Sequence, residues 1–372
     1  MKKIVSIILS CLMITMALCT TVDAAEIDGN KELMSLNVNE SGFKNKISIP
    51  ADAQQFAEDN YCDLIMAGQE DYSYNISETN KNKLILESPF VLYDKDETVW
   101  DEIYYYPISY KDKIILVMSV INTTAGWALS ASEEFVKELN DLEYQKDSVN
   151  TFCYDNDRNQ IKPVELNTVS DITNNDIMNM QPIDIAKIKM KSNLLSIKEG
   201  YTPSYSFNIT TGSDVGQIFK LYNRQGQGNL NICWAASVAT IVNYLQGKNL
   251  SAKKVCDDNG YSYVGQNISV KSKVLKNYGI IYSIQMSALS WKVVIKNVEQ
   301  KQPVAMSTFR SNGDGHAVTL IGYRFRNGNK YIVLWNSGNE EVQTVLYKEE
   351  NTVYQYSNSA WTWTKSLASY II

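Results

Sequence analysis

Histidine is almost absent from this sequence of 372 residues, in which His316 is the only one. The four cysteines beyond residue 24 (Cys62, Cys153, Cys233 and Cys256) lack the spacing of metal ligands, and one histidine cannot complete a Cys/His zinc site. Four cysteines over this length are also too few for a disulfide framework. We therefore expect no metal and no cofactor. Cys62 and Cys153 could form a disulfide with each other. Their spacing alone does not decide whether they do.

An excess of positive charge is also missing. The chain has 35 Lys and Arg against 41 Asp and Glu, which gives a net charge of −6 and a pI near 5.1. Without a basic field, nucleic acid and anionic membranes are not expected partners. Apolar residues make up 44% of the chain, as in globular proteins. The length leaves room for two domains.

Long apolar runs are absent beyond the first residues, so we expect no stable membrane insertion. The start of the chain is basic, an apolar run follows over 4–18, and Val22 and Ala24 flank a cleavage site. This pattern predicts a secretory signal peptide over 1–24 and a secreted protein of bacterial type. A leucine precedes Cys19, and it is too large for a usual lipoprotein cleavage site.

The segment 25–166 is predicted to be a strand-rich α+β domain. A helix is expected over 51–66, after Pro50. A second helix is expected over 132–139, capped by Ser130. The apolar and aromatic stretches between and after these helices predict strands over 83–86, 89–93, 102–106, 113–118, 127–129, 149–154 and 161–166.

The segment 167–214 is polar and rich in turn residues, so we predict a linker that contains a cleavage site. The segment 215–372 is predicted to be a second α+β domain, with helices first and strands afterwards. Its expected helices are 233–245, 270–278 and 291–299. Its expected strands are 303–306, 317–321, 331–334 and 342–347.

Cys233 follows a loop rich in Gly and Asn and begins an apolar helix. The free N–H groups and the dipole at a helix N-terminus favour a thiolate, which is the nucleophilic form. Gln227 lies six residues earlier, close enough for its side-chain amide to reach the site of the Cys233 thiol. Gln225 is a rival, because 225–228 repeats the Gln-Gly pattern. For an isolated cysteine, a buried structural role is the competing interpretation.

His316 lies at the start of a predicted strand, after Gly315. A thiol nucleophile needs a base that titrates near neutrality, and this chain offers only this one. Asn336 ends the next strand, where its amide oxygen would accept a hydrogen bond from the histidine ring. Without Cys233 and His316, the segment after Trp335 would be interpreted as a simple turn. Asp314 is expected to be a loop residue.

These motifs, in this order, resemble the papain-type cysteine proteases. Cys233-Trp234-Ala235-Ala236-Ser237 resembles their active-site helix, Gln227 their oxyanion-hole glutamine, the segment 315–323 their histidine strand, and Trp335-Asn336 their asparagine corner. The short spacings are most similar to the staphopains, and the upstream domain resembles their inhibitory propeptide, a half-barrel. Two positions depart from the pattern: Leu230 replaces a second cysteine, and Ser337-Gly338 stands where relatives often have a shielding Trp, so that Trp335 is the nearest substitute.

The resemblance implies a papain-like catalytic domain, with helices on an antiparallel sheet, preceded by a propeptide domain. It further implies a monomeric endopeptidase made as an inactive precursor, with protein or peptide substrates and its own propeptide as inhibitor. Cys233, His316 and Asn336 would form the catalytic set, and Gln227 and the Cys233 main chain the oxyanion hole. The alternatives are a cell-wall amidase, a transglutaminase-like acyltransferase, or a non-catalytic adhesion or inhibitor module.

Overall fold

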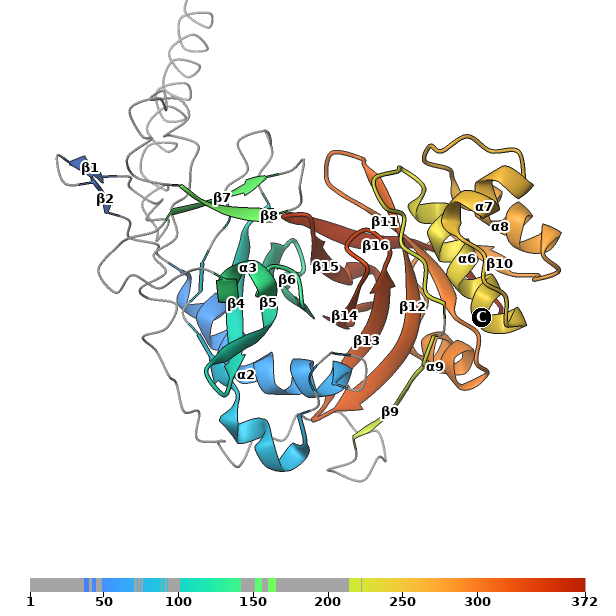
Figure 1. Cartoon of the computed structure of the whole chain (residues 1–372). Coiled ribbons are helices and arrows are strands. Elements are labelled where there is room, and N and C mark those ends of the chain that lie inside the picture. Colours follow the sequence, from blue (N-terminus) through green and yellow to red (C-terminus); the bar gives the residue numbers. More distant parts are fainter. Residues whose placement is uncertain are drawn as a thin grey trace, which may run out of the picture.

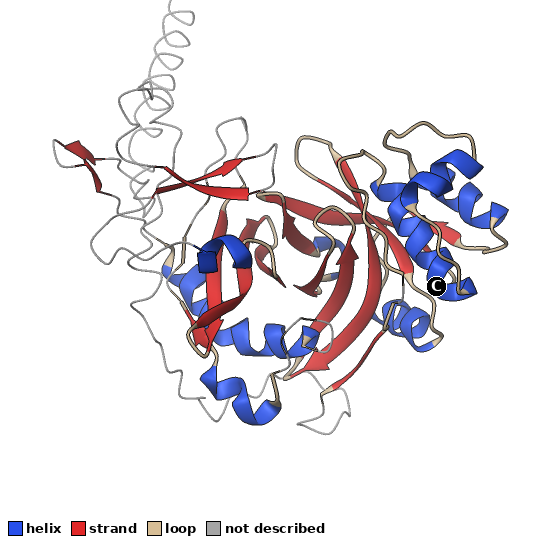
Figure 2. Ribbon diagram, in the orientation of Figure 1, coloured by secondary structure: helices blue, strands red, loops and turns tan. Residues whose placement is uncertain are grey.

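The computed structural model describes most of the chain beyond residue 48, with gaps. The described residues are 37–39, 42–44, 49–69, 72, 74, 76–87, 89–90, 92, 101–141, 151–155, 160–164, 214–221 and 223–371. The predicted signal peptide over 1–24 lies outside them, as does nearly all of the predicted linker over 167–214. The elements and their arrangement are shown in Figures 1 and 2.

The N-terminal part is mainly strands, with α2 (Ala51–Gly68) as its long helix. Pro50 precedes the first turn, and α2 buries one face through residues such as Ala57 and Leu64. The helix predicted over 51–66 is confirmed. The other elements are β1 (Asn37–Asn39), β2 (Gly42–Lys44), η1 (Glu78–Lys83), β3 (Ile85–Leu86), β4 (Ile103–Tyr110), β5 (Lys113–Thr123), β6 (Gly126–Ser132), α3 (Val136–Asp141), β7 (Thr151–Asp155) and β8 (Gln160–Val164).

The C-terminal part has its helices before most of its strands, as predicted. Its helical elements are α6 (Cys233–Gln246), α7 (Ala252–Asp258), α8 (Ile268–Asn277), α9 (Trp291–Glu299) and η3 (Glu349–Asn351). Its strands are β9 (Val215–Ile218), β10 (Ser283–Gln285), β11 (Val304–Phe309), β12 (Gly315–Arg326), β13 (Asn329–Asn336), β14 (Glu341–Leu346), β15 (Val353–Tyr356) and β16 (Ser359–Ala368). The three predicted helices and four predicted strands are all present. The prediction missed α7, the short strands β9 and β10, and the β15–β16 hairpin.

One antiparallel sheet runs through both parts of the chain. Its strand order is β10-β16-β11-β12-β13-β14-β6-β5-β4-β3, with β15 paired to β16 and β9 paired to β12. The N-terminal and C-terminal strands meet where β14 pairs with β6, at Thr344↔Ala131 and Val345↔Ser130. The sheet is strongly curved, so that β15 also packs against β5 and β6. The predicted boundary between two domains therefore does not interrupt the sheet.

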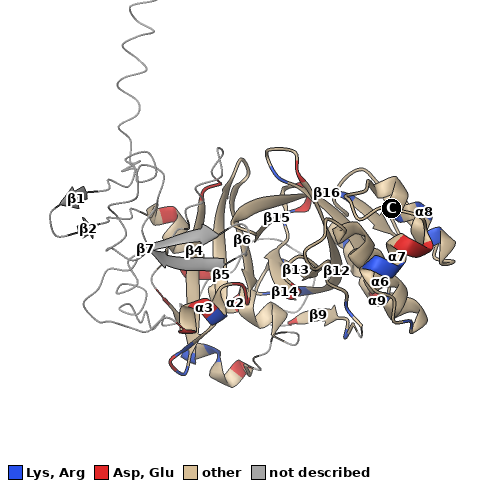
Figure 3. Cartoon of the chain, turned by 45° about the horizontal axis from the view of Figure 1, so that its top comes forward, with Lys and Arg blue, Asp and Glu red and all other residues tan. Residues whose placement is uncertain are grey.

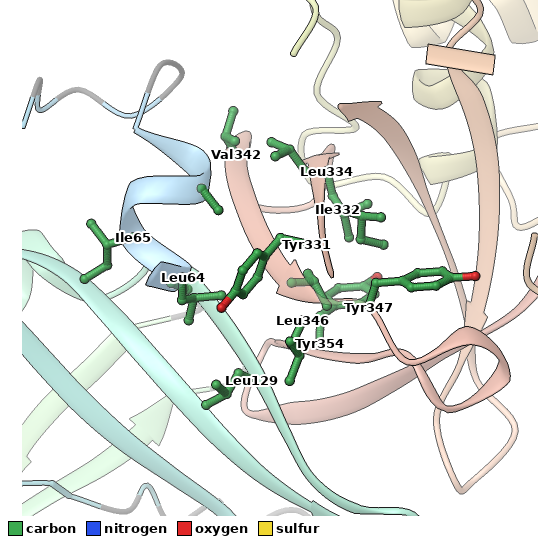
Figure 4. Close-up of a cluster of buried hydrophobic side chains, with 14 of the residues drawn as sticks. Leu64, Ile65, Leu129, Tyr331, Ile332, Leu334, Val342, Leu346, Tyr347 and Tyr354 are labelled. Carbon is green, nitrogen blue, oxygen red and sulfur yellow. The ribbon is translucent and has the colours of Figure 1, made fainter. Parts of the chain in front are cut away.

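The two parts also share a hydrophobic core. Helix α2 packs on β14, β13 and β12 as well as on β6 and β5. In Figure 4, Leu64 of α2 lies beside Tyr331 of β13, and Ile65 extends from the other side of the helix. All three side chains are buried in the same cluster. Removing the N-terminal part would therefore expose apolar surface on the C-terminal part.

The helix predicted over 132–139 with Ser130 as its cap is wrong at its start. Ser130 and Ser132 belong to strand β6, and the helix begins only at Val136. The Ser130 hydroxyl accepts a hydrogen bond from the main-chain N–H of Gln355, at 3.0 Å. Pairing of β6 with both β5 and β14 holds Ser130 in extended backbone, so tertiary contacts outweigh a local capping preference.

A buried ionic cluster is a further link between the two parts. The guanidinium of Arg326, at the end of β12, donates to Asp63 at 2.8 Å, to Glu78 at 2.9 Å and to Asp214 at 2.9 Å. The Arg326 side chain is 5% exposed, whereas the three carboxylates are between 17% and 50% exposed. A guanidinium this deeply buried is stable only when its donors are used, as they are here.

Charged side chains lie mainly on helices and loops, while most of the sheet carries neither sign (Figure 3). Within the described ranges, no helix combines the length and the apolar character needed to cross a membrane.

Candidate active site

Cys233 is the first residue of α6, as the sequence predicts. The helix is rich in Ala, Val and Ile and is buried without interruption from Trp234 to Asn243. It ends at Gln246 and is capped by Gly247, whose φ of 63° is a left-handed conformation that glycine adopts without a steric penalty. Because the helix is packed on nearly all sides, its N-terminus holds the Cys233 side chain in a fixed position against β12.

The thiol of Cys233 interacts with His316, the one histidine of the chain. Burial acts to raise the pKa of this thiol, but the hydrogen bond with the His316 side chain and the charge of that ring lower it. A hydrogen bond with the Ala317 main chain adds to the lowering, and the net effect is a pKa below the usual value. The surroundings of Cys233 therefore favour the thiolate, the form that attacks carbonyl carbons.

His316 and Asn336 come together because β12 and β13 are adjacent antiparallel strands. Val318 is the register partner of Asn336, which places His316 just beyond that pair. The Nε2 atom of His316 lies 2.8 Å from Oδ1 of Asn336, and both residues are buried. With Nε2 held by an amide oxygen, Nδ1 is the ring nitrogen left for the thiol.

Asn336 is itself held by further contacts. Its Oδ1 also accepts the Gly338 N–H at 3.0 Å, and its Nδ2 donates to Oε1 of Gln343 at 3.4 Å. Gln343 in turn donates to the main-chain oxygen of Gln355, at 2.9 Å. This network orients the amide so that its oxygen faces the ring.

Two aromatic side chains that were not predicted, Tyr356 and Trp361, shield the His316–Asn336 contact. The Tyr356 ring stacks on His316, with centroids 4.7 Å apart, and Trp361 lies at 5.4 Å. A Cβ at position 338 would lie 2.1 Å from the Tyr356 hydroxyl, so glycine there makes room for this tyrosine. Trp335, the expected substitute, instead donates its indole N–H to the Gln225 main chain at 3.1 Å. The aromatic pattern over 354–363 was the signal available for this hairpin.

Of the two candidate glutamines, the geometry favours Gln227. Its N–H donates to the Ser337 main chain at 3.0 Å, and its Oε1 accepts from the Ser337 hydroxyl at 3.4 Å. These contacts hold it beside the turn after Asn336. The Gln225 side chain donates to the main-chain oxygen of Asn223, at 3.1 Å. With the Gln227 oxygen bound to Ser337, its NH₂ group is the end available to donate to an oxyanion.

The remaining candidates have structural roles. Asp314 is an exposed loop residue whose N–H donates to the Asn312 side chain. Cys62 and Cys256 carry free thiols, so Cys62 does not form the bridge to Cys153 that spacing left open. In the part of the chain that the structure describes, no group of three or more His, Cys, Asp or Glu side chains is placed to hold a metal ion.

Replacing Asn336 with alanine is expected to lower kcat for peptide hydrolysis by at least about 10²-fold, because the His316 ring loses the acceptor that fixes its orientation. KM should change little, since no substrate contact is removed. Steady-state kinetics would measure both values, with the exposed Asn312→Ala as the matched control and a melting curve to verify folding. A folded Asn336→Ala protein with wild-type kcat would contradict the role given to Asn336.

A cluster of carboxylates from both parts of the chain lies near the site. Burial raises the pKa of Glu341, on β14, to about 9, and the charges of Glu134, Glu133 and Glu138 add to the rise. Asn339 and the Glu134 main chain donate to the Glu341 carboxylate. Glu341 is the register partner of Asn336, and the charge of Glu134 also raises the pKa of Tyr356. The loop before α3 therefore approaches the aromatic cover of His316.

Replacing Glu341 with glutamine is expected to make stability less dependent on pH. The folded chain holds the Glu341 proton up to about pH 9, whereas the unfolded chain releases it near the usual value of 4.5. Stability from this group is therefore full below about pH 4.5 and is lost as pH rises toward 9. The slope is at most about 1.4 kcal/mol per pH unit, and solvent screening of a partly exposed side chain reduces it.

Urea unfolding of the full chain at several pH values would measure this slope, with the exposed Glu350→Gln as control. A Glu341→Gln protein with the same slope as wild type would show that this carboxyl is not the titrating group.

Together, a thiol with a lowered pKa, a histidine hydrogen-bonded to it and an asparagine behind the ring form the type of site found in cysteine peptidases. The sequence comparison agrees: residues 217–369, less than half of the chain, match the model of the Peptidase_C39 like family. The matched span contains Gln227, Cys233, His316 and Asn336 and does not extend upstream of 217. The match supports a cysteine peptidase with a papain-like fold in this part of the chain.

No curated protein sequence matches the chain. Among solved structures, 22 chains are similar. One comes from a study of the mite allergens Blo t 1 and Der p 1, with 16% sequence identity and a TM-score of 0.29, over 42% of this chain and 73% of that chain. A TM-score of 0.29 is too low to establish a common fold.

Proposed function

We propose that the chain is a cysteine endopeptidase in which Cys233 and His316 form a thiolate–imidazolium pair. The observation that carries the proposal is the placement of His316, whose Nε2 lies 2.8 Å from Oδ1 of Asn336 and whose ring lowers the pKa of the Cys233 thiol. The thiolate attacks a peptide carbonyl and forms a tetrahedral intermediate. His316 then protonates the leaving amine, and water releases the acyl group from the thioester.

Two donors are available for the oxyanion of that intermediate. The Cys233 main-chain N–H lies in the first turn of α6, where the N–H groups have no partner within the helix. The Gln227 side chain is held beside the turn after Asn336 by Ser337. Donors fixed in advance by packing stabilise developing charge without reorganising, and each contributes on the order of 100-fold or more in rate.

We further propose that the N-terminal part keeps the enzyme inactive until it is cleaved off, as in a staphopain-like precursor. Its contacts support this role. Ser130 bonds Gln355, Tyr105 donates to Asn358 at 2.7 Å, and Asp101 accepts the Ala360 N–H at 2.8 Å. These bonds hold the hairpin that carries Tyr356 and Trp361. In this proposal the chain is secreted through residues 1–24, is cut within 167–214, and acts as a monomer on proteins.

Casein and purified peptidoglycan, offered to the secreted protein in parallel, would separate the candidate functions. The proposal predicts casein cleavage that an epoxide inhibitor of thiol peptidases abolishes. Cleavage of peptidoglycan alone would favour a cell-wall amidase, and cleavage of neither substrate would favour a binding module. Mass spectrometry of the active species should place its N-terminus within 167–214. Full activity of the uncut chain would contradict the precursor proposal but leave the peptidase proposal intact.

A further inference from the structure

Lys271 is the most deeply buried lysine that the structure describes, and it lies on α8 at 1% exposure. Its Nζ donates to the Ser307 hydroxyl of β11, at 2.5 Å. Among the described ion pairs, none joins Lys271 to a carboxylate. A buried ammonium with a hydroxyl partner but no carboxylate is costly, so another negative group is expected nearby.

That group is the Cys233 thiol at the start of α6, because α6 and α8 both pack against the sheet around Ala317. Ser237 of α6 bonds Thr319 on that face. Ser307 of β11 and Ala317 of β12 are register partners, and residues directly opposite each other in an antiparallel pair point to the same face. Ser307 binds the ammonium, while the Ala317 main chain binds the thiol. Helices α6 and α8 pack against each other at this end of the sheet (Figure 1). The adjacent strands β11 and β12 therefore supply partners for both the ammonium and the thiol.

The charged neighbours of the two groups are few. His316 of β12 acts on the thiol and lowers its pKa. Burial raises the pKa values of Tyr354 and Tyr356, on β15, and the charge of Cys233 adds to the rise. The charge of Lys365, on β16, acts to lower the pKa of Lys271. Burial lowers the pKa of Lys271 to about 8, while the Cys233 charge acts to raise it. In turn, the Lys271 charge contributes to lowering the pKa of Cys233.

We propose that Lys271 is a positioning residue whose buried ammonium, together with His316, holds the Cys233 sulfur as a thiolate. This inference deepens the proposed peptidase function and rests on it. With a pKa of about 8, Lys271 is still charged at neutral pH. The thiolate thus has a second counter-charge that does not depend on the histidine.

Ultraviolet absorbance of the thiolate, followed against pH in the full chain, tests this inference without any peptide substrate. Cys233→Ala supplies the reference spectrum, so that the difference reports on this one thiol. Lys271→Met removes the charge and keeps the length. We expect its titration midpoint to rise by about one pH unit, the low end of what a neighbouring opposite charge contributes. Lys271→Arg, which keeps the charge, should retain most of the wild-type midpoint.

Lys273→Met is the matched control, because Lys273 lies on the same helix and is exposed. Its midpoint should equal that of the wild type. If Lys271→Met does not fold, Lys271→Gln, which can still bond Ser307, takes its place. A folded neutral variant with an unshifted midpoint would overturn the inference and leave Lys271 as a packing residue. Because the readout is thiol ionisation, the role of Lys271 can be tested even if the chain cleaves no peptide.

Discussion

Replacing Cys233 with alanine is expected to reduce kcat for peptide hydrolysis by about 10⁶-fold, the loss typical of removing a catalytic nucleophile. The methyl group cannot attack a carbonyl, and no acyl-enzyme forms. The fold should persist, because Cys233 is the first residue of α6 and alanine is a good helix former. Steady-state hydrolysis of casein or a fluorogenic peptide would measure the loss, with Cys256→Ala as control. Cys256 is buried in α7 and has no part in the proposed chemistry.

His316→Ala should cost almost as much as Cys233→Ala. The thiol depends on the ring for its ionised form, and the leaving amine depends on it for a proton. The double variant should be no slower than either single variant, because groups that act as one unit do not contribute additively. Two independent losses that multiply in the double variant would contradict the pairing of these residues, as would a Cys233→Ala protein with substantial hydrolysis.

Replacing Arg326 with methionine is expected to lower the free energy of unfolding by about 3 kcal/mol, the low end for breaking a buried ion pair. The low end applies because Asp63, Glu78 and Asp214 are partly exposed and can recover some hydration. Methionine fills most of the volume, so the loss reports on charge and hydrogen bonding rather than on a cavity. Urea unfolding of the full chain at neutral pH would measure it.

The pH dependence of the same cluster gives a second check. The hydrogen bond with Arg326 holds the pKa of Glu78 below its usual value. Stability from this pair is therefore present above the usual carboxyl range and is lost as pH falls through the lowered pKa. Arg326→Met should remove that acid-sensitive component, whereas Arg324→Met, on the same strand, should keep it. Equal stability of wild type and Arg326→Met at neutral pH would show that the cluster does not hold the two parts together.

Local patterns in the sequence were sufficient to predict the elements that carry the candidate site residues. The apolar run after Cys233 predicts α6, and two strong strands predict the juxtaposition of His316 and Asn336. Both signals depend on neighbours within about ten residues. They are strong because a buried helix and paired buried strands tolerate few polar side chains.

Other features depend on pairs of residues far apart in the chain, which no local pattern encodes. The pairing of Ser130 with Val345 makes one sheet from two predicted domains and turns a predicted helix cap into strand. The packing of Tyr356 on His316 requires the space above Gly338. The burial of Lys271 has no local signal either, because its helix carries several lysines and only the packing of α8 on the sheet brings this one to Ser307.

Mapping a covalent label on the secreted protein tests the central claim most directly. The chain would be treated with a limiting amount of a thiol-reactive epoxide at neutral pH, digested and sequenced by mass spectrometry. We predict that the label lies on Cys233, and that His316→Ala slows the labelling by at least about 10²-fold, because the imidazole supports the thiolate. Label on Cys62 or Cys256 in place of Cys233, or labelling of Cys233 that does not depend on His316, would contradict the proposed active site.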